Sequence, residues 1–426
     1  MVTLAIFAAL VVLMALNVPI AIATAWAAIV GFALIEDLPL TVVVQRMFTG
    51  INSFTLLAIP LFILTGRLMA LGGITNDLIQ LSRSMVGFMR GGLAYINIVA
   101  SMFFAGITGS ATADTSSVGS ILIPAMEQKG YEKDFSVAVT ATSSTIGIMI
   151  PPSIPMVIYG VISGTSIGKL FLGGVIPGLL VGLVLMSITA VLARRRGYPV
   201  EAAFDARATA RNFIKSIPPL TTVLIILGGI IFGVFTATEA AGVAALYSFL
   251  LGTLYYRELK LRQLPGIMIE VATITSMVAL MIETASALAW LLASQQVPQA
   301  MGDYLLSLTG NPYLILLLFN LLLLFVGTWL DLSPALIIFT PILLPIAIEL
   351  GVDPVHFGVI MVVNLAIGLF TPPVGVCLFV ACGIAGISIT DSIRALIPFF
   401  FGLVAVLLIV TYVPPAVMLI PNALMP

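Results

Sequence analysis

A polar segment, GITGSATADTSSVG at residues 106–119, lies between two apolar runs of the chain. Its serine, threonine and aspartate side chains supply the oxygen atoms that small, hard cations prefer, and Asp114 is its one ionisable group. Lipid cannot hydrogen-bond to the backbone groups of a turn inside a bilayer, so nearby hydroxyls must satisfy them. The segment therefore indicates a site for an ion or a small solute within a membrane.

A second segment, TATSSTIGIMIPPSIP at residues 140–155, fits the first. Pro151 and Pro152 lack N–H donors and obstruct the preceding turn, so a helix must break there and leave carbonyl oxygens free at residues 147–150. The hydroxyls just before the break belong to Ser143, Ser144 and Thr145. If the turn and the break face each other, they form one oxygen-lined cation site.

The composition explains how such segments come to lie in lipid. The chain of 426 residues is 61% hydrophobic and 8% charged, whereas soluble proteins carry about 25% charged residues. Apolar runs of helix length recur without period-two alternation, which favours helices over a β-barrel. The single His356 excludes a multi-histidine metal site, and Cys377 and Cys382 are interpreted as small hydrophobic residues. The sequence predicts an all-α integral membrane protein.

Two segments have polar middles and are predicted to be re-entrant helical hairpins, at about residues 88–127 and 311–349. The first apolar stretch has no basic region before it and is interpreted as a retained span. Full crossings are predicted at about residues 3–35, 53–72, 134–165, 167–193, 217–235, 239–256, 268–294, 357–386 and 395–420.

The positive charges support this topology with the N-terminus in the cytoplasm, because only Arg46 and Lys169 then fall outside. The polar stretch 194–216 becomes a cytoplasmic connector, and the short mixed segments 36–50 and 257–266 are expected to lie along the membrane surface. The acidic residues expected in the external connections are Glu36, Asp37, Asp303, Glu349 and Asp353.

The two polar regions are copies of one pattern. When Ile121 is aligned with Ile342, ILIP at 121–124 falls on ILLP at 342–345, and IGIMIPP at 146–152 falls on IGLFTPP at 367–373 without a gap. The first copy enters from the cytoplasm and the second from outside, and the crossing at 217–235 supplies the inversion. We therefore predict two inverted repeats, residues 1–216 and 217–426, each with scaffold helices, a hairpin and a broken helix (134–165 and 357–386).

Inverted repeats with broken helices are typical of secondary transporters whose sites lie near the bilayer midplane. The second copy offers Asp331 and Ser333, expected to face Asn364 and Thr371. The absence of a Gly-Lys-Ser/Thr phosphate-binding loop disfavours an ATP-driven pump. Two further intramembrane acids, Glu239 and Glu283, are candidates for ion binding, gating or helix packing.

Four segments resemble the large membrane subunit of tripartite ATP-independent periplasmic (TRAP) transporters: FAGITGSATADTSSVGSILIPAM, IGIMIPPSIPMVIYG, FTATEAAGVAALY and GLFTPPVGVCLFV. The third departs from the family pattern at Ala237, where proline is expected. Members of the family import carboxylates such as sialic acid or C4-dicarboxylates by an elevator-type movement. The resemblance implies a non-enzymatic symporter in the bacterial cytoplasmic (inner) membrane, coupled to Na+. It also implies two partners, a small four-helix membrane subunit and a soluble periplasmic substrate-binding protein.

The resemblance also implies roles for particular residues. It implies that the two hairpin tips border the substrate through Thr108, Ser110, Asp114, Asp331 and Ser333. It implies one sodium near Gly106, Ser143, Ser144 and Gly147, and another near Gly327, Asn364, Gly368 and Thr371. No arginine is expected inside the core, so helix N-termini and bound sodium would have to balance a substrate carboxylate.

The residues leave three other functions open. A stand-alone sodium/dicarboxylate or sodium/proton carrier of similar architecture would transport without a binding protein. A passive channel would conduct without coupling to a gradient. An intramembrane lipid-modifying enzyme is disfavoured, because the chain has one histidine and no paired-aspartate metal motif.

Overall fold

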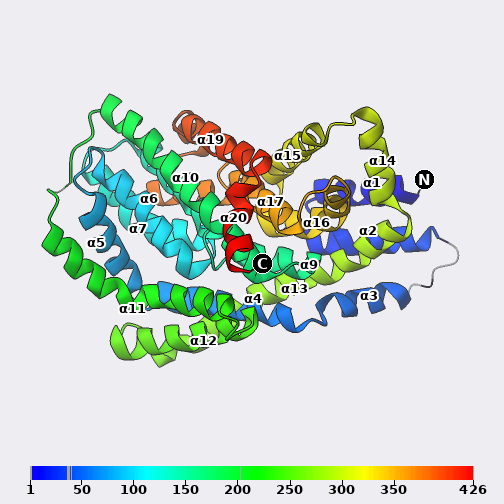
Figure 1. Ribbon diagram of the computed structural model, residues 1–426, viewed down its shortest axis with the longest axis horizontal. Coiled ribbons are helices and arrows are strands. Elements are labelled where there is room, and N and C mark those ends of the chain that lie inside the picture. Colours follow the sequence, from blue (N-terminus) through cyan, green and yellow to red (C-terminus); the bar gives the residue numbers. More distant parts are fainter. Residues whose placement is uncertain (1, 36–38, 40, 202, 426) are drawn as a thin grey trace.

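The computed structural model describes residues 2–35, 39, 41–201 and 203–425, and the described elements are helices (Figure 1). Eight of these helices are long and apolar enough to cross a membrane. This confirms the predicted all-helical membrane architecture. Glu36 and Asp37, expected in an external connection, lie outside the described residues.

The first half of the chain ends with the long helix α10. Its elements are α1 (Val2–Ala15), α2 (Ile20–Ala33), α3 (Thr41–Ile51), η1 (Phe54–Leu57), α4 (Ala58–Leu71), α5 (Ile74–Val86), α6 (Gly92–Thr108), α7 (Ala111–Gln128), α8 (Lys133–Ser143), η2 (Ser144–Ile148), α9 (Ile154–Ser163) and α10 (Ile167–Arg195).

The second half repeats this order. Its elements are α11 (Ala206–Ile231), α12 (Ala237–Leu250), the π-helical η3 (Leu251–Tyr255), η4 (Leu261–Gln263), α13 (Leu264–Ser294), α14 (Val297–Leu308), α15 (Pro312–Trp329), α16 (Leu332–Glu349), α17 (Pro354–Gly368), α18 (Val376–Ala385), α19 (Ile389–Tyr412) and α20 (Pro415–Leu424).

Helix boundaries of the two halves coincide in the alignment that places Ile121 on Ile342. Helix α7 begins at Ala111 and ends at Gln128, and α16 begins at Leu332 and ends at Glu349 (332 − 111 = 349 − 128 = 342 − 121). Helices α6 and α15 correspond in the same way within one residue. Both hairpins therefore turn at equivalent positions, between residues 108 and 111 and between 329 and 332.

The predicted single crossing at 3–35 is wrong, because the structure divides it into α1 and α2. Asn17 has a positive φ of 60°, and Pro19, which has no N–H donor, precedes α2. The two helices of 14 residues each are about 21 Å long and pack against each other. The chain therefore reverses direction near residue 17.

The predicted crossing at 217–235 belongs to a longer helix, α11. Asp205 caps its N-terminus by accepting hydrogen bonds from the backbone N–H groups of Arg207 (2.9 Å) and Ala208 (3.2 Å), so the helix begins inside the expected connector. In the repeat alignment, α1 falls on positions 223–236 and overlaps α11. Helix α11 is thus the partner of α1 and not an extra crossing, and the boundary predicted between residues 216 and 217 falls inside it.

Two other segments, the surface arm at 257–266 and the crossing at 395–420, also differ from their predicted structure. The arm predicted at 257–266 leads through η4 directly into the 31-residue α13, whose first turn contains Pro265, so it forms no separate surface helix. The crossing predicted at 395–420 is two helices, α19 and α20, because Pro414 and Pro415 lack N–H donors. The other arm, predicted at 36–50, contains helix α3.

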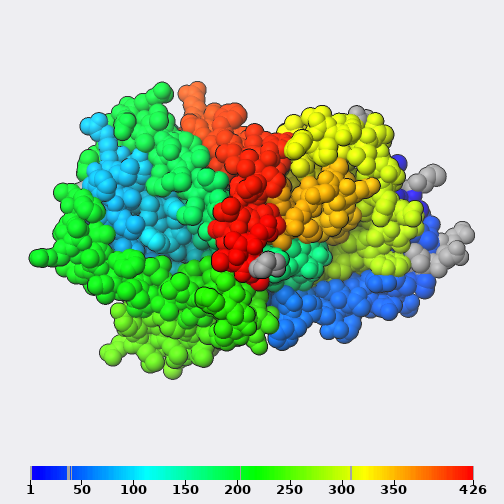
Figure 2. All heavy atoms as spheres, viewed as in Figure 1, coloured from blue at the N-terminus to red at the C-terminus, as the bar shows by residue number. Residues whose placement is uncertain are grey.

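The hairpins and broken helices of both halves form one central body. Helix α7 packs on α18, α16 on α9, and α10 on α17, so each half supplies walls to the other. The remaining long helices surround this body: α13 packs on α2 and α3, and α12 on α4 (Figure 1). Figure 2 shows the C-terminal segment (red) running across the middle of this face of the molecule.

Candidate functional site

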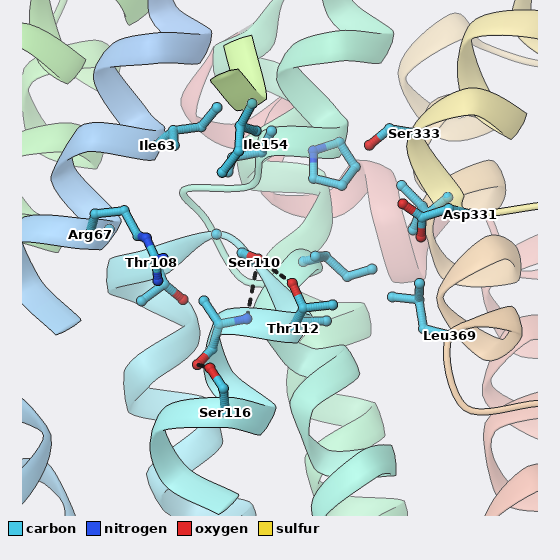
Figure 3. Close-up of a pocket in the computed structure, with 18 of the residues that line it drawn as sticks. Ile63, Arg67, Thr108, Ser110, Thr112, Ser116, Ile154, Asp331, Ser333 and Leu369 are labelled. Atoms are coloured by element: carbon cyan, nitrogen blue, oxygen red, sulfur yellow. Dashed lines mark hydrogen bonds between the residues drawn. The ribbon is translucent and has the colours of Figure 1, made fainter. Parts of the chain in front are cut away.

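A cavity of about 520 Å³ lies where both hairpin tips meet helices α4 and α13. Figure 3 shows side chains from both tips and from α4 around it. Its polar walls consist of Arg67, Thr108, Ser110, Thr112, Ser116, Glu270, Asp331 and Ser333. Four of the five residues expected at the tips, all except Asp114, therefore line one cavity.

The first tip is built on Gly109, whose φ of 62° favours glycine. A Cβ at this position would lie 2.6 Å from the carbonyl oxygen of Pro152, so only glycine lets the tip reach the break before α9. Ser110 follows as the N-cap of α7, and its hydroxyl accepts a hydrogen bond from the N–H of Ala113 (3.4 Å). The tip thus presents a helix N-terminus to the cavity.

The second tip repeats this arrangement with a different cap. Asp331 is the N-cap of α16, but its side chain makes no capping hydrogen bond and is exposed. Asp331 and Ser110 occupy equivalent repeat positions (331 − 110 = 342 − 121), as do Ser333 and Thr112. Two helix N-termini therefore converge on the cavity, and N-terminal N–H groups and the helix dipole attract negative charge.

Asp114, which the resemblance places beside the substrate at the first tip, lies elsewhere in the structure. It lies one turn into α7, is completely buried and does not line the cavity. Its carboxylate is approached by Ser101 and Ser144, yet neither of its oxygens has a hydrogen-bond partner of standard geometry among the described residues. The reason is that Ser110 forms the tip, so position 114 lies behind it against the broken helix. The repeat equivalent of Asp114 is Ala335 (335 − 114 = 342 − 121).

Two of the first set of expected sodium residues lie near this buried carboxylate: Ser144 lies beside it, and Ser143 is linked to it through Ser101. Ser143 donates to the side-chain oxygen of Asn97 (3.2 Å) and accepts from Ser101 (3.2 Å). Gly147 lies in η2 against the first tip, since a Cβ there would lie 3.4 Å from the carbonyl oxygen of Ser110. Gly106 and Ser144 complete the set, and both are buried. The structure brings these residues together behind the tip.

The second set lies at the equivalent place in the other half. Asn364 is the repeat partner of Ser143 (364 − 143 = 342 − 121), and its amide donates to the side-chain oxygen of Asn320 (2.9 Å). Its own side-chain oxygen is buried without a partner among the described residues. Gly327 and Gly368 touch through their backbones, because a Cβ on Gly368 would overlap the Gly327 carbonyl oxygen. Thr371 donates to the carbonyl oxygen of Ile367 (2.6 Å) at the end of the same helix.

Comparison with known proteins identifies the chain's family. Residues 7–416 match the family model described as the tripartite ATP-independent periplasmic transporter, DctM component. The chain belongs to this TRAP transporter family. Its members are membrane transport proteins, and the family match confirms the resemblance seen in the four sequence segments.

Individual relatives of this TRAP subunit are similar over nearly their whole length. The sialic acid TRAP transporter large permease protein SiaM of Vibrio cholerae is 40% identical, covering 95% of each chain. The C4-dicarboxylate TRAP transporter large permease protein DctM of Pseudomonas aeruginosa is 41% identical, covering 88% of each chain. The YdaH transporter of Alcanivorax borkumensis shares the fold with a TM-score of 0.65, at 15% identity over 89% of this chain and 87% of that one.

The hairpins and broken helices of this TRAP subunit contribute no arginine to the described lining of the cavity, but the neighbouring helix α4 does. Arg67 of α4 lines the cavity between the tips and forms an ion pair with Glu270 of α13. The topology in which only Arg46 and Lys169 fall outside predicts that Arg67 lies on the cytoplasmic side. An ionisable residue within an apolar run was itself a signal of function, but the sequence did not show which side chains surround it.

The two additional acidic candidates take no part in the cavity. Glu239 forms a capping box at the start of α12, where its carboxylate accepts from the N–H (2.8 Å) and the hydroxyl (2.9 Å) of Thr236. This capping role accounts for the side chain locally. Glu283 lies half-buried in α13 outside the cavity lining.

Proposed function

We propose that the chain is the transport subunit of a sodium-coupled symporter that imports an organic anion across the bacterial inner membrane. A periplasmic binding protein delivers the anion, and a small membrane subunit accompanies this chain. Sialic acid and C4-dicarboxylates are the substrates named for the two relatives above. Both are carboxylates, and we take a carboxylate as the substrate class.

The observation that carries the proposal is the convergence of the N-termini of α7 and α16 on one cavity. Each terminus offers unpaired N–H groups and a partial positive charge to a bound anion. The cavity volume of about 520 Å³ is within the range of small-molecule sites.

Sodium coupling is supported by buried side-chain oxygen atoms behind each tip that have no hydrogen-bond partner among the described residues, those of Asp114 and Asn364. Burying an ionised carboxylate such as that of Asp114 costs roughly several kcal/mol of folding free energy unless a cation or a proton balances its charge. Free carbonyl oxygens beside the helix breaks suit sodium in broken-helix transporters. One ion would bind with Asp114, Ser143 and Ser144, and the second with the side-chain oxygen of Asn364. Sodium at these places would hold each tip against its broken helix and so prepare the cavity for the anion.

The transport step requires no chemical reaction. The central body carries both tips and both breaks, whereas α2, α3 and α13 pack together outside it. We propose that the loaded central body moves against these outer helices as an elevator. Sodium bound at both tips would favour the loaded form for this movement, which couples the two fluxes.

We also propose that the N-terminus lies on the periplasmic side, which revises the sequence expectation. Helices α1 and α2 form a hairpin, so the chain returns to the side on which it began. The distribution of Lys and Arg places the connection after α2 outside. The N-terminus then lies outside with it, and the rest of the topology is unchanged.

The test is uptake into liposomes that contain this chain and its small subunit. Radiolabelled sialic acid and succinate are supplied separately, with or without the binding protein, under an inward sodium or potassium gradient. Uptake that requires both sodium and the binding protein supports the proposal. Uptake without the binding protein supports the stand-alone carrier instead. Movement of the anion without a cation gradient supports a channel.

A further inference from the structure

Arg67 is the one positively charged residue among the described residues that line the cavity between the tips. Two acids accompany it, Glu270 on α13 and Asp331 on the second tip. Arg67 and Glu270 form an ion pair while their side chains keep 32% and 39% of their surface exposed. The pair therefore belongs to the wall of the cavity and is accessible to a bound solute.

The guanidinium of Arg67 has more donors than Glu270 uses. The ion pair is made through Nη2, whereas Nε is buried and has no hydrogen-bond partner among the described residues. A guanidinium carries five N–H donors in a planar fork that matches a carboxylate in a bidentate manner. The Nη donors that Glu270 does not use are therefore the ones that can bind a second carboxylate, or Glu270 can be exchanged for one.

The position of Arg67 relative to the first tip is fixed by backbone contact. A Cβ on the preceding Gly66 would lie 2.9 Å from the carbonyl oxygen of Thr108, so α4 approaches the tip at this residue as closely as glycine permits. Thr108 also lines the cavity. Figure 3 shows Arg67 reaching from α4 toward Thr108, with Asp331 and Ser333 on the opposite side.

We propose that Arg67 is the counter-charge for a carboxylate of the transported molecule and that Glu270 occupies this place when the cavity is empty. The inference rests on the proposed function and adds a specificity-determining residue to it. The anion binds between the two helix N-termini. Its carboxylate then replaces Glu270 as the ion-pair partner of Arg67. When the anion leaves, Glu270 restores the ion pair, so the arginine is never left unbalanced in a cavity of low polarity.

A different role for the pair would be structural, as a tie between α4 and α13. The two roles give opposite results for a charge exchange. A structural tie is restored when the two charges are swapped in R67E/E270R, because the attraction between the helices is the same. A substrate site is not restored, because the arginine then projects from α13 and a carboxylate replaces it beside Thr108.

The experiment measures sodium-driven uptake of sialic acid and succinate by the complete transporter in liposomes. The variants are R67Q, R67K, E270Q and R67E/E270R. The matched control is R83Q, which breaks the Arg83–Glu201 ion pair outside the cavity. A second readout is the midpoint of the anion titration that protects the purified two-subunit complex against thermal unfolding, because it does not depend on the binding protein.

We expect R67Q to raise both the KM and the titration midpoint by about tenfold to a hundredfold, the effect of losing a hydrogen-bonded charge. R67K is expected to fall between R67Q and the wild type. E270Q removes the competing carboxylate and lowers the midpoint, whereas R83Q leaves it unchanged. An unchanged midpoint in R67Q, or wild-type behaviour in R67E/E270R, overturns this inference and leaves the proposed function intact. A wild-type transporter that neither binds nor moves either anion contradicts both.

Discussion

Ser110 and Asp331 occupy the N-cap positions of the two helices whose N-termini face the same cavity, and these positions are equivalent in the repeat. Their side chains behave differently: Ser110 accepts a capping hydrogen bond from its own helix, whereas Asp331 makes none. The two tips therefore share one backbone plan but differ in charge. The proposed anion, bound between the tips, would therefore meet two unlike surfaces.

This difference predicts unequal effects of truncation on stability. Ser110→Ala is expected to cost about 1 kcal/mol, the usual loss for a helix N-cap. Asp331→Ala is expected to change stability by less than about 0.5 kcal/mol, because no capping bond is lost. Thermal unfolding of the purified two-subunit complex compares them. Equal losses for the two variants would show that Asp331 does cap α16.

Asp114 is expected to link sodium to folding. Wild-type stability should rise by about 2.8 kcal/mol for each tenfold increase in sodium above both dissociation constants, about 1.4 kcal/mol from each of the two proposed sites. Asp114→Asn should remove about half of this rise, the part due to the first site, and because it removes an unbalanced buried charge it should stabilise the complex in sodium-free buffer. Ser120→Ala, at an exposed position of the same helix, is the control. A sodium-dependent rise in Asp114→Asn that is as steep as in the wild type would contradict the assignment.

Asp114→Ala tests the same carboxylate by transport. We expect it to abolish uptake while the complex remains folded, because the ion site is lost but the tip is still capped by Ser110. Radiolabelled uptake and size-exclusion chromatography measure the two properties on one preparation. Uptake at the wild-type rate would exclude a role for Asp114 in coupling.

The contact between Gly327 and Gly368 predicts strong sensitivity to one methyl group. Gly368→Ala forces the second hairpin away from its broken helix and should cost about 1–3 kcal/mol or more. Gly383→Ala, in α18 with open space around its Cβ, should instead gain about 0.4–1 kcal/mol. Thermal unfolding distinguishes them, and similar values for both would argue against close backbone contact at Gly368.

Tyr198 is expected to hold the connector after α10 against the central body. Its side chain is buried, with 4% of the residue surface exposed. The centroid of its ring lies 4.2 Å from the ring centroid of Tyr131 and 5.0 Å from that of Phe135. Tyr198→Ala should cost about 3–5 kcal/mol through lost packing. Tyr198→Phe should cost only about 1 kcal/mol, from the hydrogen bond that the hydroxyl donates to Glu132. A larger loss in Tyr198→Phe than in Tyr198→Ala would reverse this ranking of packing over hydrogen bonding.

The side of the membrane on which the N-terminus lies is open to direct labelling. A cysteine introduced by Thr3→Cys should react with a membrane-impermeant maleimide added to intact cells whose outer membrane has been permeabilised. A cysteine introduced by Ala203→Cys, in the connector expected on the cytoplasmic side, should react only after lysis. Protection of Thr3→Cys in intact cells would return the N-terminus to the cytoplasm.

The sequence by itself determined the membrane environment, the helical class and the polar segments at which the chain turns or breaks. These features depend largely on local chemistry: repeated apolar runs of helix length favour lipid, and Pro151 and Pro152 lack the N–H donors that a continuous helix uses. A proline pair alone does not decide a break, because Pro218 and Pro219 lie inside the continuous helix α11. The glycines and prolines shared at one constant spacing also exposed the internal repeat, because they dictate backbone shape without help from tertiary contacts.

The tertiary structure decided which of these residues meet. Arg67 and Glu270 lie far apart in the sequence on separate helices, and nothing local shows that both line one cavity. Asp114 is a polar residue in the segment that forms the first tip, yet it lies behind the tip because Ser110 caps the helix one turn earlier. Helix propensity and hydropathy act over a few residues, whereas the charge lining a site depends on how distant helices pack. The sequence therefore located the two tips, and only the packing of α4 and α13 against them placed an arginine between them.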